Sequence, residues 1–277
     1  MSAIDDVFAR CAKEGRAAFI PFLMAGDPDL ETTAALVEAL AAGGADLIEL
    51  GVPFSDPIAD GPVNQRAANR ALAAGTKLAG ILQMIARLRD KTGVPIVLFT
   101  YFNPILARGV ERFAEQAAAS GVDGVLCVDL PPEEGMLELV PALRRHGVDS
   151  IFLLAPTSTR ERVQRVAAAS SGFVYYVSRT GVTGERAALP AELAKEVKRL
   201  RKKLGLPLAV GFGISSPAHV AAVGEVADGV VVGSALVRLM EEHGDDPALP
   251  SLLEERMREL TEPLRRPNER KTERRRA

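Results

Sequence analysis

Short apolar runs rich in β-branched residues alternate with longer amphipathic segments about eight times along this chain of 277 residues. This strand–helix order predicts a parallel sheet covered by helices, because each helix must bury its apolar face against the strands. The expected strands span residues 17–25, 45–52, 95–102, 124–130, 149–155, 173–178, 206–213 and 228–235. Eight such units indicate a closed (β/α)8 barrel, a TIM barrel, since an open doubly wound sheet usually has five or six strands. We therefore expect one α/β domain over residues 1–277, with an extra N-terminal helix before the first strand.

Composition excludes several other classes of protein. With 47% apolar and 25% charged residues, the chain can bury enough surface to fold, so a disordered protein is excluded. No apolar run approaches the roughly 20 residues that cross a bilayer, and the acidic N-terminal segment is unlike a secretory signal. Two cysteines, Cys11 and Cys127, are too few for a disulfide framework and are expected as buried free thiols. These properties predict a cytoplasmic protein with no membrane partner.

The formal net charge of −2 is unevenly distributed along the chain. Residues 265–277 hold seven basic and two acidic residues, so the rest of the chain carries about −7. A body of this charge repels the phosphate backbone of nucleic acids. We therefore expect no nucleic-acid partner, and we interpret 265–277 as a flexible, solvated basic tail.

Glu49 is the most unusual residue of the expected strands. The alternation of side chains along 45–52 places Leu47, Glu49 and Gly51 on one face. Because helices cover the outside of a barrel and side chains fill its inside, this carboxyl group is buried on either face. A buried carboxyl group either has a raised pKa or pairs with a donor. The first case makes Glu49 a general acid and base, and the second makes it a structural residue held by backbone amides or an arginine.

Two connections from a strand to the following helix are unusually long, at 51–62 and 179–190. Short connections are the norm, and in a TIM barrel these loops lie at the face where substrates bind. The first loop contains Asp56 and Asp60, and Asp60 is a candidate for a second acid–base group beside Glu49. The alternative role of both aspartates is turn formation beside the prolines of the loop.

The ends of the last two expected strands are rich in glycine. GFGISSP ends the seventh strand and GSA ends the eighth, and each leads into a helix. Backbone N–H groups at a helix N-terminus bind phosphate without a basic side chain, and barrels commonly bind phosphate after strands 7 and 8. GVTG, which begins at Gly181, would add further donors. The pattern predicts a phosphate site, and the alternative is that these glycines only form tight turns.

The positions of lysine and histidine narrow the chemistry. No expected strand contains a lysine, so an imine between a lysine and a carbonyl substrate is not expected. His146, His219 and His243 fall in helical or surface segments without the paired spacing of metal ligands, and we expect them at the surface. No metal site is therefore predicted, and the chemistry has to depend on carboxyl groups, hydroxyl groups and backbone donors.

Apolar residues at other strand ends predict a hydrophobic part of the pocket beside Glu49. The candidates are Phe22, Tyr101, Cys127, Leu153 and Phe212. Tyr175 and Tyr176 point in opposite directions, so only one of them can face the barrel interior. Together with the phosphate site, these residues indicate a ligand with an apolar end and a phosphate end, and plain core packing is their alternative role.

Several motifs resemble, in order and spacing, the tryptophan synthase alpha subunit family: PFLMAGDPD, ELGVPFSDPIADGP, SRTGVTG with GFGISSP, and the final GSA. The resemblance spans about residues 19–234, and its second motif is highly specific. It implies a lyase of tryptophan biosynthesis, which cleaves indole-3-glycerol phosphate by a retro-aldol reaction to indole and D-glyceraldehyde 3-phosphate. It also implies that Glu49 exchanges protons with indole C3 and the side-chain hydroxyl, and that Asp60 binds the indole N–H.

The resemblance assigns further positions of the site. The implied substrate contacts are Phe22, Tyr175, Thr183, Gly184, Phe212, Gly213, Gly233 and Ser234. Of these, the three glycines and Ser234 would hold the phosphate, while Thr183 would help to position Asp60. The chain departs from the family pattern at Asn64, where an aliphatic residue is expected, and this changes the polarity of the implied indole pocket.

The family works as a complex of two alpha and two beta subunits, and the resemblance implies the same for this chain. The beta subunit would bind pyridoxal phosphate and join indole to serine, so no cofactor is expected in this chain. The loops that carry Pro53, Phe54, Asp56 and Asn103 would face the beta subunit, which is consistent with their apolar character.

Two alternatives stay open on the sequence. The chain could be another phosphate-binding barrel enzyme, such as an indole-glycerol phosphate synthase or an isomerase, although the absence of lysine from the strand ends argues against the synthase. It could also be a catalytically weak subunit that mainly activates a partner. The presence of both Glu49 and Asp60 argues against this second alternative.

Overall fold

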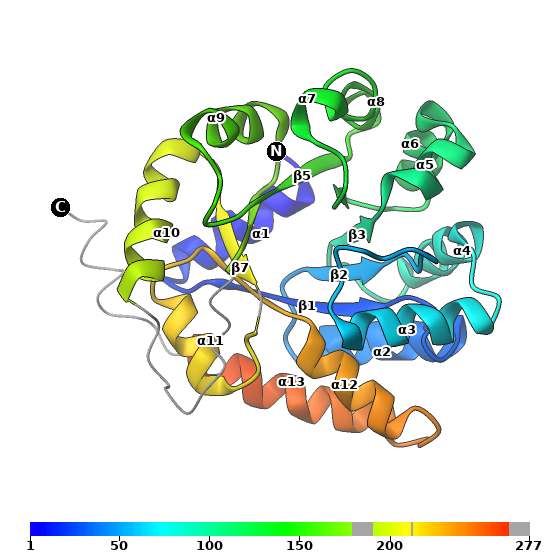
Figure 1. Ribbon diagram of the computed structural model, residues 1–277. Helices are drawn as coiled ribbons and strands as arrows, with labels where there is room; N and C mark the ends of the chain where they lie inside the picture. The colour runs from blue at the N-terminus through cyan, green and yellow to red at the C-terminus, as the bar shows by residue number, and fades with distance from the viewer. Residues whose placement is uncertain (179–190, 212, 266–277) are drawn as a thin grey trace.

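The computed structural model describes residues 1–178, 191–211 and 213–265, and within them eight parallel strands form a closed barrel in chain order (Figure 1). The strands are β1 (Ala18–Met24), β2 (Ile48–Gly51), β3 (Ile96–Thr100), β4 (Gly124–Cys127), β5 (Asp149–Leu154), β6 (Val174–Val177), β7 (Leu208–Gly211) and β8 (Gly229–Val232). Strand β1 pairs with both β2 and β8, which closes the barrel. The predicted TIM barrel is confirmed.

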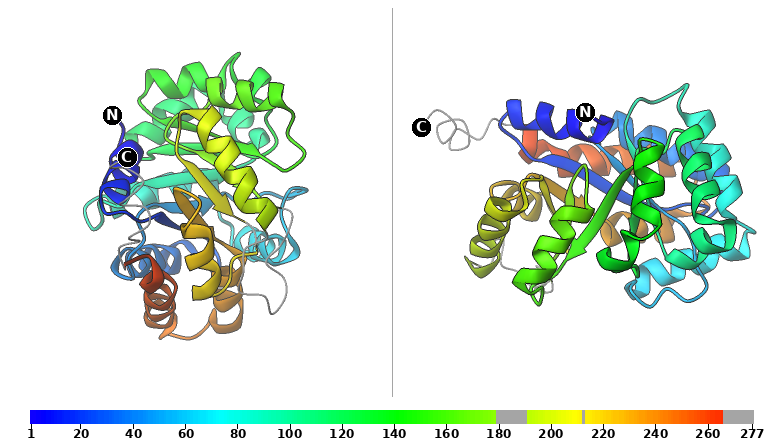
Figure 2. Two further views of the ribbon diagram at one scale, coloured as in Figure 1. Left: turned by 90° about the vertical axis from the view of Figure 1, so that its left-hand side faces the viewer. Right: turned by 90° about the horizontal axis from the view of Figure 1, so that it is seen from above.

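Every strand is followed by at least one helix on the outside of the barrel (Figures 1 and 2). The helices are α1 (Ala3–Lys13), α2 (Leu30–Ala42), α3 (Pro62–Ala73), α4 (Leu78–Leu88), α5 (Phe102–Arg108), α6 (Val110–Ala119), α7 (Pro132–Gly135), α8 (Leu139–Arg145), α9 (Arg160–Ala169), α10 (Ala191–Leu204), α11 (Pro217–Gly224), α12 (Ser234–His243) and α13 (Leu249–Arg265). Helix α13 packs against α2 and α11, so the last helix completes the ring beside the first units. Arg265, the first residue of the predicted basic tail, ends α13, and 266–277 lie outside the described residues.

Within the described ranges, no single helix is both long and apolar enough to span a bilayer. Only α3 and α4 taken together reach that length, and they meet at a bend of 94°.

The extra N-terminal helix α1 is also confirmed, and it covers the amino-terminal end of the barrel. Its buried apolar side chains, which pack against the barrel interior, are Ile4, Val7, Phe8 and Cys11. Ile4 and Phe8 approach Gly124 and Gly229, the first residues of β4 and β8. The floor of the barrel is therefore closed by apolar packing, and the opposite end is left for a ligand.

Side-chain alternation along the strands separates two apolar cores. In β2, Ile48 and Leu50 pack against the surrounding helices, whereas Leu47, directly before the strand, packs inside the barrel. Glu49 lies between these outward residues in sequence and therefore faces inward with Leu47. The predicted faces of this segment are confirmed.

The predicted strands are too long at their carboxyl-terminal ends. Strand β7 ends at Gly211 and β8 ends at Val232, although strands were expected to continue to 213 and 235. Ser234 is already the first residue of α12, because the glycine before it lets the chain turn directly into a helix. The glycine-rich segments therefore belong to the loops at the open end of the barrel.

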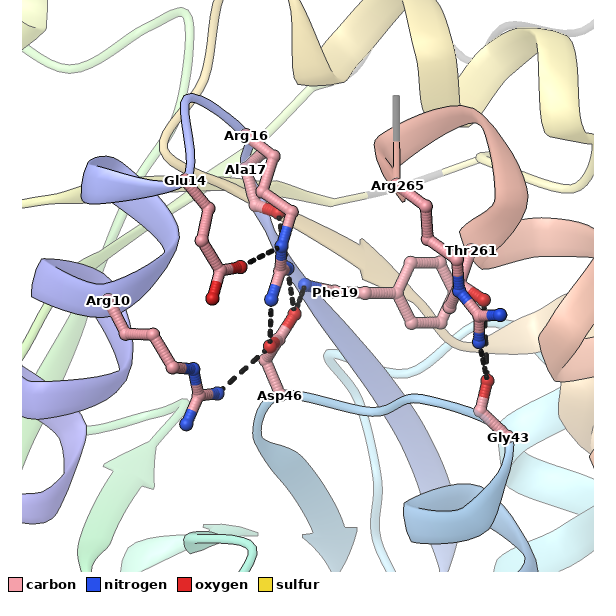
Figure 3. Close-up of polar contacts among 9 residues, drawn as sticks. All are labelled: Arg10, Glu14, Arg16, Ala17, Phe19, Gly43, Asp46, Thr261 and Arg265. Carbon is pink, nitrogen blue, oxygen red and sulfur yellow. Dashed lines mark hydrogen bonds and ion pairs between the residues drawn. The ribbon is translucent and has the colours of Figure 1, made fainter. Parts of the chain in front are cut away.

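An ion-pair cluster links α1, β1 and the segment before β2 at the amino-terminal end (Figure 3). The Asp46 carboxylate, only 6% exposed, accepts hydrogen bonds from Arg16 at 2.6 and 2.8 Å and from Arg10 at 3.0 Å. It also accepts the backbone N–H of Phe19 at 2.9 Å. Burial alone would raise the pKa of this carboxyl group, but the donors outweigh burial, and the pKa of Asp46 is lowered.

Replacing Asp46 with asparagine should destabilise the fold, because Arg10 and Arg16 would lose the buried carboxylate that they share, and Arg16 would keep only the more exposed Glu14. We expect Asp46→Asn to lower the free energy of unfolding by about 3 kcal/mol and the thermal midpoint by on the order of 10 °C, measured by scanning calorimetry. As a control, Glu38→Gln removes an exposed partner of Lys91 and should shift the midpoint by less than about 2 °C. Since folding lowers the pKa of Asp46, its stabilising effect should be lost below about pH 4. A difference between wild type and Asp46→Asn that persists at acidic pH would contradict this account.

Candidate active site

A cavity of about 880 Å³ lies at the carboxyl-terminal ends of the strands. It is lined by Phe22, Glu49, Gly61, Pro62, Val63, Asn64, Phe99, Tyr175, Gly213, Ile214, Ser215, His219, Val231, Gly233, Ser234, Ala235 and Arg238. These residues come from strands β1, β2, β3, β6 and β8 and from the segments after β2, β7 and β8. Six residues predicted for the site from distant parts of the sequence are thus brought together: Phe22, Glu49, Tyr175, Gly213, Gly233 and Ser234.

Glu49 lies in the wall of this cavity, and no charged partner among the described residues holds it ionised. It is paired in register between Phe22 of β1 and Val97 of β3, and it is 1% exposed. Its Oε1 atom is buried and has no hydrogen-bond partner among the described residues. Burial raises the pKa of Glu49 to about 8, and no other cause contributes to the shift. The carboxyl group is therefore mostly neutral at pH 7, as a general acid requires.

Tyr175 stands beside Glu49, and its ring occupies space that Gly211 leaves open. A Cβ atom on Gly211 would lie 2.1 Å from the Tyr175 hydroxyl oxygen, so only glycine fits at the end of β7. Burial, and then the charge of Glu49, raise the pKa of Tyr175. Tyr176 packs in the outer core instead, which confirms that only one of the two tyrosines faces inward.

Asp60 lies in the loop between β2 and α3, next to the cavity residues Gly61 and Asn64. Its Oδ2 atom accepts a hydrogen bond from the Tyr101 hydroxyl at 3.0 Å, and that hydroxyl accepts the backbone N–H of Ala59 at 3.0 Å. Burial raises the pKa of Asp60, while hydrogen bonds from Tyr101 and Asn64 oppose the rise. Asp60 thus keeps donors that favour its charged form, in contrast to Glu49.

The glycine-rich segments after β7 and β8 form the other end of the cavity. Gly213 has a φ of 76°, a conformation that favours glycine. Helix α12 begins at Ser234 after Gly233, and no side chain caps its N-terminus. Its first backbone N–H groups therefore remain available to an anion, and they carry the positive end of the helix dipole.

Three other residues expected at the hydrophobic part of the pocket do not line the cavity. Tyr101 is turned toward Asp60. Cys127 packs in the outer core, because its neighbour Leu126 takes the inward position in β4. Leu153 packs against the inner core and does not line the cavity, although it is paired in register with Tyr175. Phe99 of β3 contributes the missing aromatic surface, with its ring 5.3 Å from that of Phe22.

The remaining predicted positions lie in the loop after β2, in helix α5, or outside the described ranges. Thr183, Gly184 and Phe212 lie outside the described residues. Of the positions expected to face a partner, Pro53 is buried, Phe54 is half-buried, and Asp56 and Asn103 are exposed. Within the described residues, no group of three or more histidine, cysteine, aspartate or glutamate side chains is placed to hold a metal ion.

The surface position expected for His219 is wrong. His219 is 9% exposed and lines the cavity, on the face of α11 that also buries Val220 and Val223. The spacing of four residues between His219 and Val223 is the signal that could have located it. Arg238, one helical turn after Ser234, also lines the cavity and was not predicted from the sequence.

The polar atoms of the cavity stand out from the rest of the described structure. In the whole described structure, five buried side-chain polar atoms have no hydrogen-bond partner. They belong to Glu49, Asn64, Asp149, Ser170 and His219. Glu49, Asn64 and His219 all line this one cavity. A cavity of similar volume between α1 and α10, at the other end of the barrel, is lined by none of the five. Because buried polar groups are normally paired, the cavity is built for a polar ligand.

Comparison with known proteins agrees with this site. The family model described as "Tryptophan synthase alpha chain" matches residues 8–263. Among curated relatives of the same name, one from Solibacter usitatus is 53% identical over 260 residues, which cover 94% of this chain and 97% of the relative. Another, from Geobacter sulfurreducens, is 55% identical over 241 residues, which cover 87% and 91%.

Solved structures with the same fold carry the same description. Tryptophan synthase subunit alpha from Legionella pneumophila superimposes with a TM-score of 0.89 at 36% identity, covering 95% of this chain and 98% of that one. A chain from the a2b2 complex of Pyrococcus furiosus tryptophan synthase superimposes with a TM-score of 0.84 at 40% identity, covering 90% and 99%. The motifs, the barrel and these relatives agree that the chain belongs to the tryptophan synthase alpha chain family.

Proposed function

We propose that this chain, as a lyase of its family, binds indole-3-glycerol phosphate in the cavity and cleaves it to indole and D-glyceraldehyde 3-phosphate. The observation that carries the proposal is the pairing of a neutral, buried Glu49 with available backbone N–H groups across the same cavity. The first group suits proton transfer to a carbon atom, and the second suits a phosphate.

The reaction begins with a proton transfer from Glu49. Its neutral carboxyl group donates a proton to C3 of the indole ring, which places positive charge on the ring nitrogen. The Asp60 carboxylate accepts a hydrogen bond from the ring N–H and stabilises that charge. The ring cation is the electron sink that an imine or a metal ion supplies in other aldolases.

Carbon–carbon cleavage then restores both the ring and the acid. The bond between C3 and the glycerol chain breaks, and its electron pair returns to the ring. The proton of the adjacent hydroxyl group passes to the Glu49 carboxylate as the carbonyl group forms. Indole and D-glyceraldehyde 3-phosphate are released, and Glu49 is protonated again.

The substrate lies between an aromatic wall and an anion site. Phe22 and Tyr175 contact its length, while Gly213, Gly233 and Ser234 hold the phosphate through backbone N–H groups. On the family pattern, Phe212 and Gly184 add to these contacts, and Thr183 positions Asp60.

The chain works in the cytoplasm with a beta subunit, in a complex of two alpha and two beta subunits. Indole passes to that subunit, which binds pyridoxal phosphate and completes L-tryptophan, so this chain needs no cofactor of its own. The described a2b2 complex of the Pyrococcus furiosus relative supports this assembly. Exposed Asp56, with Pro53 and Phe54, lies in the loop after β2, and exposed Asn103 lies at the start of α5; both segments are assigned to the contact.

Glu49→Gln should abolish most of the activity, because the amide has the size of the acid but cannot donate the proton to C3. We expect the rate of indole release to fall by at least about 10³-fold, with an unchanged thermal midpoint. Glu38→Gln, an exposed glutamate outside the cavity, is the matched control. Turnover of Glu49→Gln close to that of wild type would refute the role of Glu49, and loss of turnover in both variants would point to an indirect effect.

Asp60→Asn should cause a large but smaller loss, about 10²-fold in kcat, since it removes the negative charge that stabilises the ring cation. The affinity for an unreactive phosphate ester of the substrate type should change by less than about threefold, because the phosphate is bound at the other end. Indole release and calorimetric binding measure the two effects. Equal losses in binding and turnover would instead indicate that Asp60 only shapes the site.

Activity should depend on the protonated form of Glu49. With its pKa raised to about 8, the acid form predominates at pH 7 and is lost as the pH rises. We therefore expect kcat/KM for indole release to decrease about tenfold per pH unit above about pH 8. The thermal midpoint across the same range serves as the control, and a kcat/KM that is constant up to pH 9.5 in folded protein would be inconsistent with the assignment.

A further inference from the structure

His219 has no role in the reaction described above, although it lies in the same cavity. It is the third residue of α11, and its backbone N–H bonds to the Ser216 hydroxyl that caps this helix. The loop with Gly213 leads directly into this cap, so His219 lines the end of the cavity that Gly233 and Ser234 also line. A residue in this position can contact whatever binds there.

The ring of His219 has no partner among the described residues. Nδ1 is buried without a hydrogen bond, and no described group bonds to Nε2. A proton on the enclosed Nδ1 would be a buried donor without an acceptor, which costs free energy. In the other tautomer Nδ1 is an unpaired acceptor, and the proton on Nε2 gives the ring an N–H donor for a ligand. The His219 side chain is therefore suited to a ligand with an acceptor oxygen.

The charge of the cavity favours an anion at this end. Besides His219, the carboxyl group of Glu49 and the guanidinium of Arg238 are the acidic and basic side chains among the described lining residues. Burial keeps Glu49 mostly neutral at pH 7, so Arg238 supplies a positive charge to the described lining. Arg238 forms no ion pair with the described part of the chain, and α12, which carries it, also directs its N-terminus at the cavity. A doubly charged phosphate group matches this arrangement.

We propose that His219 is a further substrate-binding residue, which donates a hydrogen bond from Nε2 to an oxygen of the phosphate monoester held at Gly213, Gly233 and Ser234. Arg238 attracts the same group from the edge of the cavity. This inference rests on the proposed function for the identity of the substrate, but the contact itself needs only a phosphate monoester.

Calorimetric titration with two matched ligands tests the contact. The first is 3-(indol-3-yl)propyl phosphate, which cannot react because its chain has no hydroxyl group, and the second is the corresponding alcohol without phosphate. His219→Leu should weaken binding of the phosphate ester about tenfold and leave the alcohol within about twofold of wild type. His219→Gln, whose amide Nε2 can donate from a similar place, should restore binding of the ester to within about threefold of wild type.

Two controls separate a phosphate contact from a general effect on folding. His243→Leu makes the same chemical change at the far end of α12 and should leave both affinities unchanged. His219→Phe keeps an aromatic ring in the buried position, so it serves where His219→Leu lowers the thermal midpoint, and it should show the same selective loss. In steady-state kinetics the loss should appear in KM, with kcat within about twofold of wild type.

The possible results differ in what they overturn. Equal weakening of the ester and the alcohol by His219→Leu and His219→Phe would reject the contact and leave His219 a structural residue. Unchanged affinity for the ester in both variants would also reject it. Binding of sn-glycerol 3-phosphate that is weakened by His219→Leu, with no affinity of wild type for the indole ester, would keep His219 as a phosphate ligand and reject the proposed substrate.

Discussion

Burial of the Glu49 carboxyl group without a charged partner is the constraint on which the site depends. Glu49 and Asp46 lie three residues apart on one segment of the chain, and both are almost completely buried. Asp46 receives two arginines and a backbone N–H, and its pKa is lowered. Glu49 receives no such donors at Oε1, and burial raises its pKa. Two buried carboxyl groups on one segment thus differ in their donors: ion pairs favour the anion of Asp46, whereas burial favours the protonated form of Glu49.

The two ends of the barrel differ in function: the amino-terminal end stabilises the fold, and the carboxyl-terminal end holds the candidate active site. At the amino-terminal end, α1 closes the barrel by apolar packing, and the Asp46 cluster pairs the buried Asp46 carboxylate. At the carboxyl-terminal end, a second network fixes the helices that flank the cavity: Arg70 of α3 binds buried Asp27 through two bonds of 2.8 Å and also binds Glu241 of α12. Arg66 of α3 binds the same Glu241. These ion pairs hold the loop with Asp60 and the helix with Ser234 at a set separation. The cavity therefore keeps unpaired polar atoms, whereas the helices beside it are joined by ion pairs.

The sequence determined most of the fold and the centre of the site, because both follow from local periodicity. Alternation along 45–52 was enough to predict that Glu49 is buried on the same face as Leu47, and the structure shows that this face is the inner one. The anion site at the glycine-rich strand ends stays a prediction. The burial of His219 was missed because a histidine fits both faces of a helix, although its spacing of four residues from Val223 indicates the buried face. The Tyr101–Asp60 hydrogen bond joins two loops across 41 residues, and no local pattern encodes it. Strand ends were misplaced for a related reason, because glycine permits both an extended chain and the turn into a helix.

The proposed retro-aldol reaction needs one neutral and one charged carboxyl group in one site, and hydrogen-bond donors are distributed unequally between Glu49 and Asp60. Both carboxyl groups are desolvated, and burial raises the pKa of each. Hydrogen bonds from Tyr101 and Asn64 favour the charged form of Asp60, whereas no such hydrogen bond lowers the pKa of Glu49. Asn64, where the family pattern has an aliphatic residue, therefore adds polarity on the side of the cavity where the proposed ring cation forms. A polar residue at that place strengthens the division of roles between the two carboxyl groups instead of weakening the pocket, because its amide acts on the group that has to stay charged.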